Sequence, residues 1–212
     1  MNQEIPRVTT KAVPFHYVEG QILVALVAQP LDDARSWQLP DTHVYNSHTT
    51  LQYLEQALRT QCGMTPRNVR YREQLYTFES PSSEDVSKNT LCLTYLYLSS
   101  ELLWHKGSKH IGLFPIDRLP NISSLDRQII QYAIERLRSK ALYTTLPGFL
   151  LPPAFTLDQY QRVFEALSGK RVDRRNFRKK LRTLNILTPA TNKGTPHYSL
   201  AESHPSILTK PF

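Results

Sequence analysis

The chain has little cysteine and no long apolar run. Cys62 and Cys92 are its only cysteines, and they follow no metal-ligand spacing, so we expect both to be reduced and buried and predict no metal site or cofactor. No apolar run approaches the roughly 18 residues that a membrane-spanning helix needs. The polar N-terminal segment MNQEIPRVTT does not resemble a signal peptide. We therefore expect a soluble, cytoplasmic protein.

Acidic residues are scarce in the last quarter of the chain. From Thr156 to Phe212 there are eleven Lys or Arg and four Asp or Glu, a net charge of +7, whereas the remaining residues carry fifteen basic and fourteen acidic side chains. Hydrophobic residues make up 40% of the sequence, which favours a packed core and argues against wholesale disorder. A near-neutral body with a basic C-terminal unit predicts that this unit binds a polyanion.

Residues 1–122 are predicted to form a mixed α/β domain. Continuous apolar or aromatic and β-branched segments are typical of strands. Glu19-Gly20 is expected to be a turn, and the polar segment ESPSSEDVSKN a hairpin loop. One helix is expected from Thr49 to Thr60, with Leu51, Leu54 and Leu58 on one apolar stripe. The expected strands are Val8–Tyr17, Gln21–Ala28, Val69–Phe78, Leu91–Leu98 and Ile111–Ile116.

Residues 123–155 are predicted to link this domain to the basic unit. Ser123 with Asp126 three residues later fits a capping box, and it begins a helix expected from about Ser124 to Ser139. The following stretch from Leu146 to Pro153 holds three prolines and one glycine, so it is not expected to be a regular helix. We interpret it as the connection into the last unit.

Residues 156–212 begin with a second amphipathic helix. Thr156 with Gln159 fits a capping box, and the helix is expected to continue to about Leu167. Gly169 then fits the residue that ends a helix in the left-handed conformation. A tight turn is therefore predicted before the most basic segment of the chain.

A third helix and a hairpin complete this unit. Asp173 is the expected N-cap of a helix running to about Leu184. Two short extended segments flank Asn192-Lys193-Gly194, which favours a hairpin because Asn and Gly tolerate positive φ. Helix, turn, basic helix and hairpin is the order of a winged helix-turn-helix, so the predicted fold is a mixed α/β domain followed by an α+β winged helix.

The third helix separates apolar from cationic residues. Between Lys170 and Arg182 there are eight basic residues and one acid, and like charges one turn apart repel. A polyanionic partner would offset that repulsion. On a helical projection at 100° per residue, the apolar side holds Phe177, Leu181 and Leu184, and the opposite side Arg175, Lys179 and Arg182, flanked by Asn176 and Arg178.

These residue types suit double-stranded DNA. Arg can donate two hydrogen bonds to guanine and Asn can pair with adenine, while a cation such as Lys193 at the hairpin tip can bind phosphate. A solvated cationic face, a protein-binding face and RNA binding remain the alternatives. The predicted DNA-binding residues are Arg171, Arg174, Arg175, Asn176, Arg178, Lys179, Arg182 and Lys193, with Arg174 and Lys180 nearer the buried side and assigned to phosphates or solvent.

The front domain resembles a Nudix domain in layout but not in chemistry. Trp37-Gln38-Leu39-Pro40, Val44 and a helix ending at Gly63-Met64 follow that fold. The signature G-x5-E-x7-R-E-U-x-E-E-x-G-U, with U apolar, fits Thr42 to Met64 without a gap, yet its carboxylates are missing, and these bind Mg²⁺. Leu58, Gly63 and Met64 agree with the signature, whereas Thr42, His48, Gln56, Ala57, Thr60 and Gln61 replace its other defining residues.

The whole chain resembles the NrtR family of Nudix-related transcriptional regulators. The most specific likeness is Asp173–Leu181, which looks like the family's recognition helix. One departure is Ser124-Leu125-Asp126, where members often have Phe-Asp-His, and it puts the usual sensor ligand in doubt. Further likenesses are Glu73–Phe78, Phe114-Pro115, Leu119-Pro120, Arg136–Lys140, Tyr143-Thr144, Leu150–Pro152 and Phe155–Leu157.

The resemblance implies a homodimeric, non-catalytic regulator of NAD-metabolism or sugar-utilisation genes that binds a DNA operator and responds to an ADP-ribose-like nucleotide. Arg59 on the former catalytic helix is a candidate partner for a phosphate, and Trp37 for a base, although a solvated arginine and a core tryptophan are the simpler interpretations. Two further alternatives are a Nudix-type nucleoside-diphosphate hydrolase with unorthodox metal ligands and a protein-interaction scaffold. A front domain that serves only for dimerisation is also consistent with the sequence.

Overall fold

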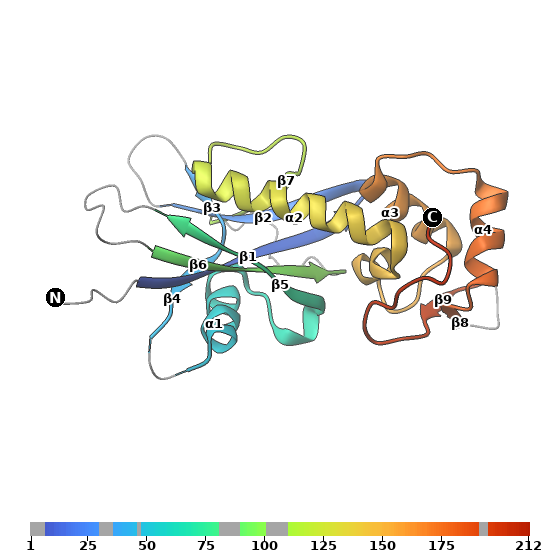
Figure 1. The fold of residues 1–212 in the computed structure, drawn as a ribbon, viewed down its shortest axis with the longest axis horizontal. Helices are drawn as coiled ribbons and strands as arrows, with labels where there is room; N and C mark the ends of the chain where they lie inside the picture. Colours follow the sequence, from blue (N-terminus) through green and yellow to red (C-terminus); the bar gives the residue numbers. More distant parts are fainter. Residues whose placement is uncertain (1–6, 30–35, 46–47, 81–89, 101–109, 191–194) are drawn as a thin grey trace.

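A mixed β-sheet with a helix on each face is joined end to end with a smaller helical unit (Figure 1). The computed structural model describes residues 7–29, 36–45, 48–80, 90–100, 110–190 and 195–212. Its strands are β1 (Arg7–Val18), β2 (Gln21–Ala28), β3 (Trp37–Gln38), β4 (Asp41–His43), β5 (Val69–Ser80), β6 (Thr90–Ser99), β7 (Ile111–Pro115), β8 (Leu187–Pro189) and β9 (Tyr198–Leu200). Its helices are α1 (Thr50–Cys62), the 3₁₀ turn η1 (Pro66–Asn68), α2 (Ser124–Tyr143), the 3₁₀ helix η2 (Leu146–Leu150), α3 (Leu157–Ser168) and α4 (Arg174–Thr183).

The parallel pair β1 and β6 forms the centre of the sheet. Strand order is β3-β2-β1-β6-β5, with β4 also paired to β1 and β7 to β2, and these other pairings are antiparallel. The five strands expected from the sequence are confirmed. The short strands β3 and β4 were not predicted, because two or three residues show no alternation. The hairpin loop predicted between β5 and β6 lies largely outside the described residues.

Alternate residues of the central strands point to opposite faces of the sheet, as the two-residue strand repeat requires. Val13 and Phe15 of β1 pack in the core under α2, while Ala12 packs under α1 with Leu54 and Leu58. The sheet is therefore buried on both faces. Cys62 and Cys92 are both buried and free, as expected.

The turn between β1 and β2 is at Glu19 and Gly20, as predicted. Both have positive φ, 48° and 89°, and two such residues are typical of the tight turns that match the twist of paired strands. Glycine adopts this conformation without the steric cost that a side chain brings. The turn projects toward α3, where it lines a cavity described below.

The capping box predicted at the start of α2 is only half formed. The Ser123 hydroxyl accepts a hydrogen bond from the Asp126 N–H at 3.0 Å, but the Asp126 carboxylate does not return to Ser123. It accepts instead from Lys11 Nζ at 2.7 Å and from the Leu39 N–H at 3.2 Å. Asp126 is thus a buried tertiary contact, and the sequence interpretation of its side chain was wrong.

Helix α2 also continues to Tyr143, four residues beyond the Ser139 expected from the sequence. Tertiary contacts support this last turn, because Ala141 is fully buried and Lys140 pairs with Glu73 of β5. Glu73 also accepts hydrogen bonds from Tyr71 and Arg136. These contacts fasten the end of α2 to the sheet.

The proline-rich connection is a buried 3₁₀ helix, consistent with the prediction that it is not a regular helix. Residues Leu146 to Leu150 of η2 are all buried. Leu146, Phe149 and Leu150 belong to the same apolar core as Phe15 of the sheet and Leu181 of α4. The sheet and the C-terminal unit therefore share one continuous core instead of being joined by a flexible linker.

The C-terminal unit has the predicted winged-helix order, α3, α4, β8 and β9. Thr156 and Gln159 form the predicted capping box, and Gly169 ends α3 with a φ of 67°. Strands β8 and β9 pair antiparallel. The predicted hairpin tip Asn192-Lys193-Gly194 lies outside the described residues. Among the helices that the structure describes, none has the length and apolar character needed to cross a bilayer.

Candidate nucleic-acid interface

Helix α4 is built on a small apolar face. The Asp173 carboxylate accepts a hydrogen bond from the Asn176 N–H at 2.8 Å, which caps the first turn as predicted. Phe177 and Leu181 are buried, and Leu184, just beyond the helix, is half-buried. The apolar side therefore packs into the core and fixes which side chains face outward.

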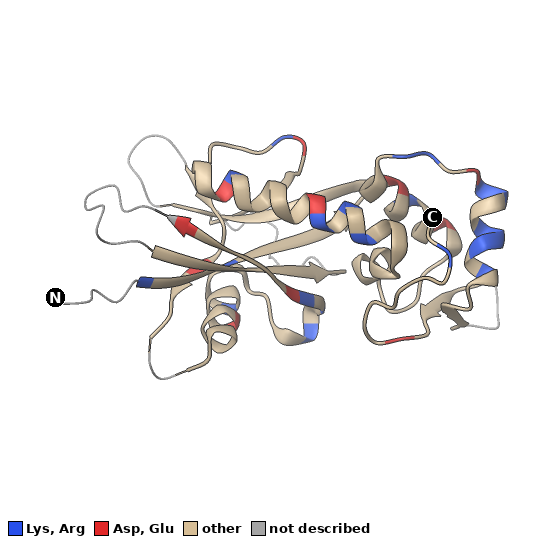
Figure 2. Cartoon of the chain, viewed as in Figure 1, with Lys and Arg blue, Asp and Glu red and all other residues tan. Residues whose placement is uncertain are grey.

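The outward face carries the predicted cations. Arg175, Lys179 and Arg182 are exposed, and Asn176 beside them is exposed as well. Within the described part of the chain, the ion pairs of α4 involve other arginines and leave these three cations to solvent. Figure 2 shows Lys and Arg positions gathered along α4, at the end of the C-terminal unit away from the sheet. This is the geometry expected of a helix that binds a polyanion.

Two other arginines of α4 face α3. Arg178 donates to Asp158 at 3.0 Å and is half-buried, while Arg174 lies 3.6 Å from the same carboxylate and is largely exposed. Arg162 of α3 approaches the other oxygen of Asp158 at 3.3 Å. A single carboxylate is therefore surrounded by three guanidinium groups. Arg178 had been predicted to flank the outward face, but the structure directs it toward α3.

The turn between α3 and α4 is organised by Glu165. Its carboxylate accepts from the Val172 N–H and from Gln161, both at 3.1 Å, and lies 3.7 Å from Arg171. Burial opposes ionisation, but these hydrogen bonds and the Arg171 charge outweigh it and lower the pKa of Glu165. The ionised carboxylate holds the turn in place. Arg171 itself remains almost fully exposed on the approach to α4.

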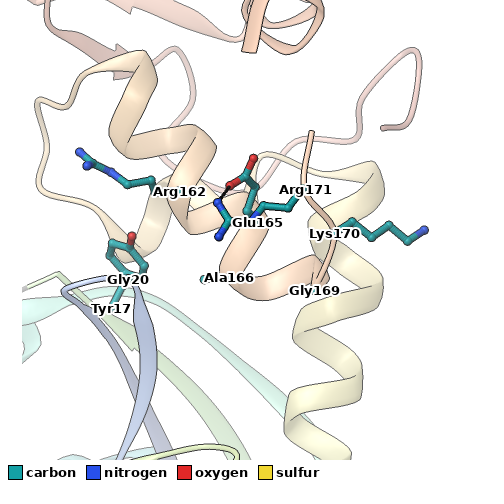
Figure 3. A pocket seen from close by; sticks show the side chains of 8 residues that line it. All are labelled: Tyr17, Gly20, Arg162, Glu165, Ala166, Gly169, Lys170 and Arg171. Atoms are coloured by element: carbon teal, nitrogen blue, oxygen red, sulfur yellow. Dashed lines mark ion pairs between the residues drawn. The ribbon is translucent and has the colours of Figure 1, made fainter. Parts of the chain in front are cut away.

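A cavity of about 350 Å³ lies where this turn meets the sheet domain. Tyr17 and Gly20 come from the β1–β2 hairpin, and the other lining residues come from α3 and the turn that follows it (Figure 3). In Figure 3, the Tyr17 hydroxyl points toward α3, and Lys170 extends away from it. The hairpin of the sheet domain and the basic turn line the same cavity, so the two regions are neighbours in the fold.

The former Nudix helix holds no carboxylate cluster. Ala57 is buried, and the Thr60 hydroxyl donates to the Gln56 carbonyl at 3.0 Å. The Gln61 side-chain amide makes two hydrogen bonds with the backbone of Asp41. Its Oε1 accepts from the Asp41 N–H at 3.2 Å, and its Nε2 donates to the Asp41 carbonyl at 2.8 Å. Where the Nudix signature has metal-binding glutamate, this chain uses glutamine to fasten α1 to β4. The described residues contain no group of three or more acidic, His or Cys side chains arranged for a metal ion.

A second cavity, of about 290 Å³, lies beside the start of α2. Trp37 lines it together with Lys11 and Asp126, and the Trp37 ring meets Phe114 edge-on at 4.8 Å. Trp37 is half-buried, so it contributes both to the core and to the cavity. Arg59 is exposed on α1 and does not line this cavity. The two candidate ligand residues are therefore not brought together here.

The charged pair in this cavity was missed by the sequence reasoning. Burial disfavours the charged form of Lys11, but the carboxylates of Asp126 and Asp41 outweigh burial and raise its pKa. The pKa of Asp41 is also raised, chiefly by its own burial. The available signal was that Lys11 is the one Lys, Arg, Asp or Glu within the predicted strand Val8–Tyr17, whereas Asp126 had been assigned to a helix cap.

Sequence and structure comparisons agree on what this chain is similar to. Residues 147–197 match the profile of the NrtR DNA-binding winged helix domain. Over 53 residues the chain is 38% identical to the ADPR-responsive transcriptional repressor NtrR of Acinetobacter baylyi, a match covering 25% of this chain and 21% of that protein. That match thus spans about a fifth of the relative's length.

The whole fold is similar to solved structures. The crystal structure of Shewanella oneidensis NrtR superposes with a TM-score of 0.82 at 26% identity, covering 97% of this chain and all of that chain. The chain therefore resembles NrtR over its whole length. The same Shewanella protein complexed with a 27mer DNA superposes with a TM-score of 0.76, again at 26% identity, over 97% of this chain and 99% of that chain. The family resemblance expected from the sequence is thereby confirmed.

Proposed function

We propose that this chain is a transcriptional repressor that inserts α4 into the major groove of double-stranded DNA. The observation that carries the proposal is the outward face of α4, where Arg175, Lys179 and Arg182 are exposed and directed away from the core. The solved DNA complex of Shewanella NrtR supports it, as does the repressor function in the name of the Acinetobacter relative.

In this proposal the side chains divide into two roles. Arg175 and Asn176, together with Arg182, face the bases, because Arg and Asn make paired hydrogen bonds to guanine and adenine. Arg171, Arg174, Lys179 and Lys193 bind phosphates and set the position of the helix on the duplex. Arg178 contributes mainly by holding α4 against α3 through Asp158.

The protein acts as a homodimer in this proposal, and its two copies of α4 enter major grooves at two half-sites one or more helical turns apart. An ADP-ribose-like nucleotide binds the Nudix-like domain, where the cavity beside Trp37, Lys11 and Asp126 is a candidate site. A ligand shifts the equilibrium only if it binds one dimer geometry better than another. Genes of NAD metabolism or sugar utilisation are the proposed targets, on the basis of the family resemblance.

The front domain is proposed to be a sensor without hydrolase activity. Ala57 and Gln61 stand where the Nudix signature has glutamate, and neither can supply the anionic oxygen that Mg²⁺ prefers. Without a bound metal there is no activated water of the usual kind. Incubation with ADP-ribose and Mg²⁺ should leave the nucleotide intact. Sustained, protein-dependent release of products would support the alternative, a nucleoside-diphosphate hydrolase with unorthodox ligands.

The decisive experiment is selection of bound sequences from a random duplex pool by the full-length protein, with and without ADP-ribose. We expect enrichment of a two-fold symmetric motif whose recovery falls when ADP-ribose is present. The double variant Arg175→Ala/Lys179→Ala should lose the motif and keep the circular dichroism spectrum of the folded protein. Arg118→Ala/Arg138→Ala is the matched control, because it removes two exposed cations outside the C-terminal unit. Undiminished binding by the α4 variant would overturn the helix assignment.

A further inference from the structure

The segment after β9 returns across the C-terminal unit and ends against two helices. It contacts the end of α2 through backbone hydrogen bonds, from the Leu208 N–H to the Tyr143 carbonyl and from the Phe212 N–H to the Leu142 carbonyl, each 2.8 Å. Thr145, just past α2, donates to the Ser206 carbonyl at 3.0 Å. The segment is therefore attached along the exit of α2 at several points.

Its last residue also contacts the apolar side of α4. The Phe212 ring stacks on Phe177 with centroids 4.8 Å apart and lies 4.7 Å from the Phe164 ring of α3. Lys180 Nζ lies over the same ring at 4.7 Å from its centroid and donates to the Pro211 carbonyl. Phe212 thus bridges two elements, with its backbone N–H bound to α2 and its ring packed on the inner face of α4.

The other contacts that hold α4 are its apolar side and the contacts of Arg174 and Arg178 with Asp158 of α3. Only Phe177 and Leu181 of its ten residues are buried, and a short cationic helix gains little stability from its own propensity. A cavity of about 260 Å³ beside it, bordered by Leu142, Phe177 and Phe212, shows that the packing between α2 and α4 is incomplete. The Phe212 ring fills part of this gap, so its loss would leave α4 with a changed or broader range of orientations.

We infer that Phe212 is a positioning residue for α4: it ties the recognition helix to the end of α2 and fixes the angle at which the cationic face meets DNA. The inference rests on the proposed function for its DNA readout. The contacts of Phe212 with α2 and α4 are called the tether below. Their effect on α4 can be tested without the proposed function, because the tether predicts how tightly α4 is held in the absence of any nucleic acid. Phe212 does not touch DNA itself, since its ring faces Phe164 and Phe177.

The tether also predicts that movements of the sheet domain are coupled to the orientation of α4. Helix α2 is fastened to the sheet by Lys140 and Glu73, and the segment from Ser206 to Phe212 is attached to the end of that helix. A shift of α2 relative to the sheet is therefore transmitted to α4 through Phe212 as well as through α3. Coupling of this kind requires an element that both regions contact.

The test compares the full-length wild type with Phe212→Ala, Phe212→Leu and Phe212→Tyr. Ile207→Ala is the control, because the Ile207 side chain is 78% exposed in the same segment. Without DNA, hydrogen exchange in peptides covering α4 should quicken in the Ala variant while peptides covering α1 stay unchanged. The Tyr variant, which keeps a ring for stacking, and the Ile207 control should exchange like wild type.

With DNA, the readout is affinity for the selected operator against affinity for a scrambled duplex, measured below the melting temperature of each variant. Phe212→Ala should lose about tenfold in operator affinity, equivalent to about 1.4 kcal/mol, and retain scrambled-duplex affinity because its cations remain. Phe212→Tyr should restore the operator affinity. A merely structural role would lower the melting temperature and leave the ratio of the two affinities unchanged, which would overturn the inference.

Phe212→Leu decides the matter if the Ala variant does not fold. Leucine keeps most of the apolar volume but loses the ring contacts with Phe177 and Lys180, so the variant should show an intermediate loss of specificity. A wild-type ratio of operator to scrambled-duplex affinity, together with wild-type hydrogen exchange of α4, would refute the tether. The two proposals can also fail separately. Faster α4 exchange in the Ala variant of a protein that selects no operator would sustain the tether and defeat the proposed function.

Discussion

Arg178 of α4 donates a hydrogen bond to Asp158 of α3 at 3.0 Å, across the turn of the helix-turn-helix unit. The same carboxylate lies 3.6 Å from Arg174 and 3.3 Å from Arg162. An acidic side chain at this place lowers the local positive charge that a phosphate would meet. It also supplies a contact that holds α4 against α3, so its structural and electrostatic effects oppose one another.

Asp158→Asn should separate these two effects. The substitution keeps the shape of the side chain and removes its charge, so affinity for a non-specific duplex should rise at low salt. The free energy of unfolding should fall by no more than about 1 kcal/mol, because the ion pairs are partly exposed and screened by solvent. Fluorescence anisotropy and urea denaturation measure the two quantities. Asp117→Asn, a matched charge change on an exposed residue, should alter neither; equal DNA gains in both variants would contradict the local role of Asp158.

Lys179→Ala should weaken the dependence of DNA binding on salt. Each phosphate contact releases condensed counterions, so removing one contact should reduce the slope of log affinity against log salt by about 1. Binding titrations at several potassium chloride concentrations measure this slope. Arg138→Ala on α2 should leave it unchanged. An unaltered slope for the Lys179 variant would mean that this side chain does not contact the phosphate backbone.

Lys11→Met should destabilise the sheet domain strongly. Lys11 Nζ lies 2.7 Å from Asp126, whose side chain is 1% exposed, and removal of one partner from a buried pair costs about 3–5 kcal/mol. The double variant Lys11→Met/Asp126→Leu removes both charges and should recover much of that loss. Urea denaturation of wild type, both single variants and the double variant completes the cycle. Additive losses in the double variant would show that the two side chains do not act as a pair.

His16 should make the fold less stable in acid. Burial lowers its pKa from 6.5 to about 4, so below pH 6.5 the unfolded chain binds a proton that the folded chain does not. The free energy of unfolding therefore falls as the pH drops from 6.5 toward 4. Between pH 7 and pH 5 this group alone should remove about 2 kcal/mol, since one pKa unit corresponds to about 1.4 kcal/mol. His16→Gln lacks this titration, and denaturation curves with an equal pH dependence for both proteins would contradict the assignment.

The elements that could be predicted from sequence are those specified by neighbouring residues. Asp173, the spacing of Phe177 and Leu181, and the opposing cations define α4 within eleven positions. Thr156 and Gln159 likewise define the start of α3. Capping and helical periodicity are local, so the residues concerned carry the information themselves.

The contacts that escaped prediction join residues far apart in the chain. Asp126 fitted a helix cap by its spacing from Ser123, yet it binds Lys11, more than a hundred positions earlier. Phe212 showed no local pattern at all, although it contacts both Leu142 and Phe177. Arg178 appeared outward on a helical projection because the projection contains no α3. Such pairings depend on the tertiary arrangement, which single-sequence periodicity does not encode.

The buried η2 segment has consequences for how the protein unfolds and for whether its winged helix can be exchanged between proteins. Because Leu146 and Leu150 lie in the same core as Phe15 and Leu181, neither half can be removed without exposing apolar surface of the other. A calorimetric scan should therefore show a single cooperative transition, with no separate melting of the DNA-binding half. The same property makes the winged helix a poor module for exchange between proteins. Each half of the chain thus depends on the other for its folding as well as for its function.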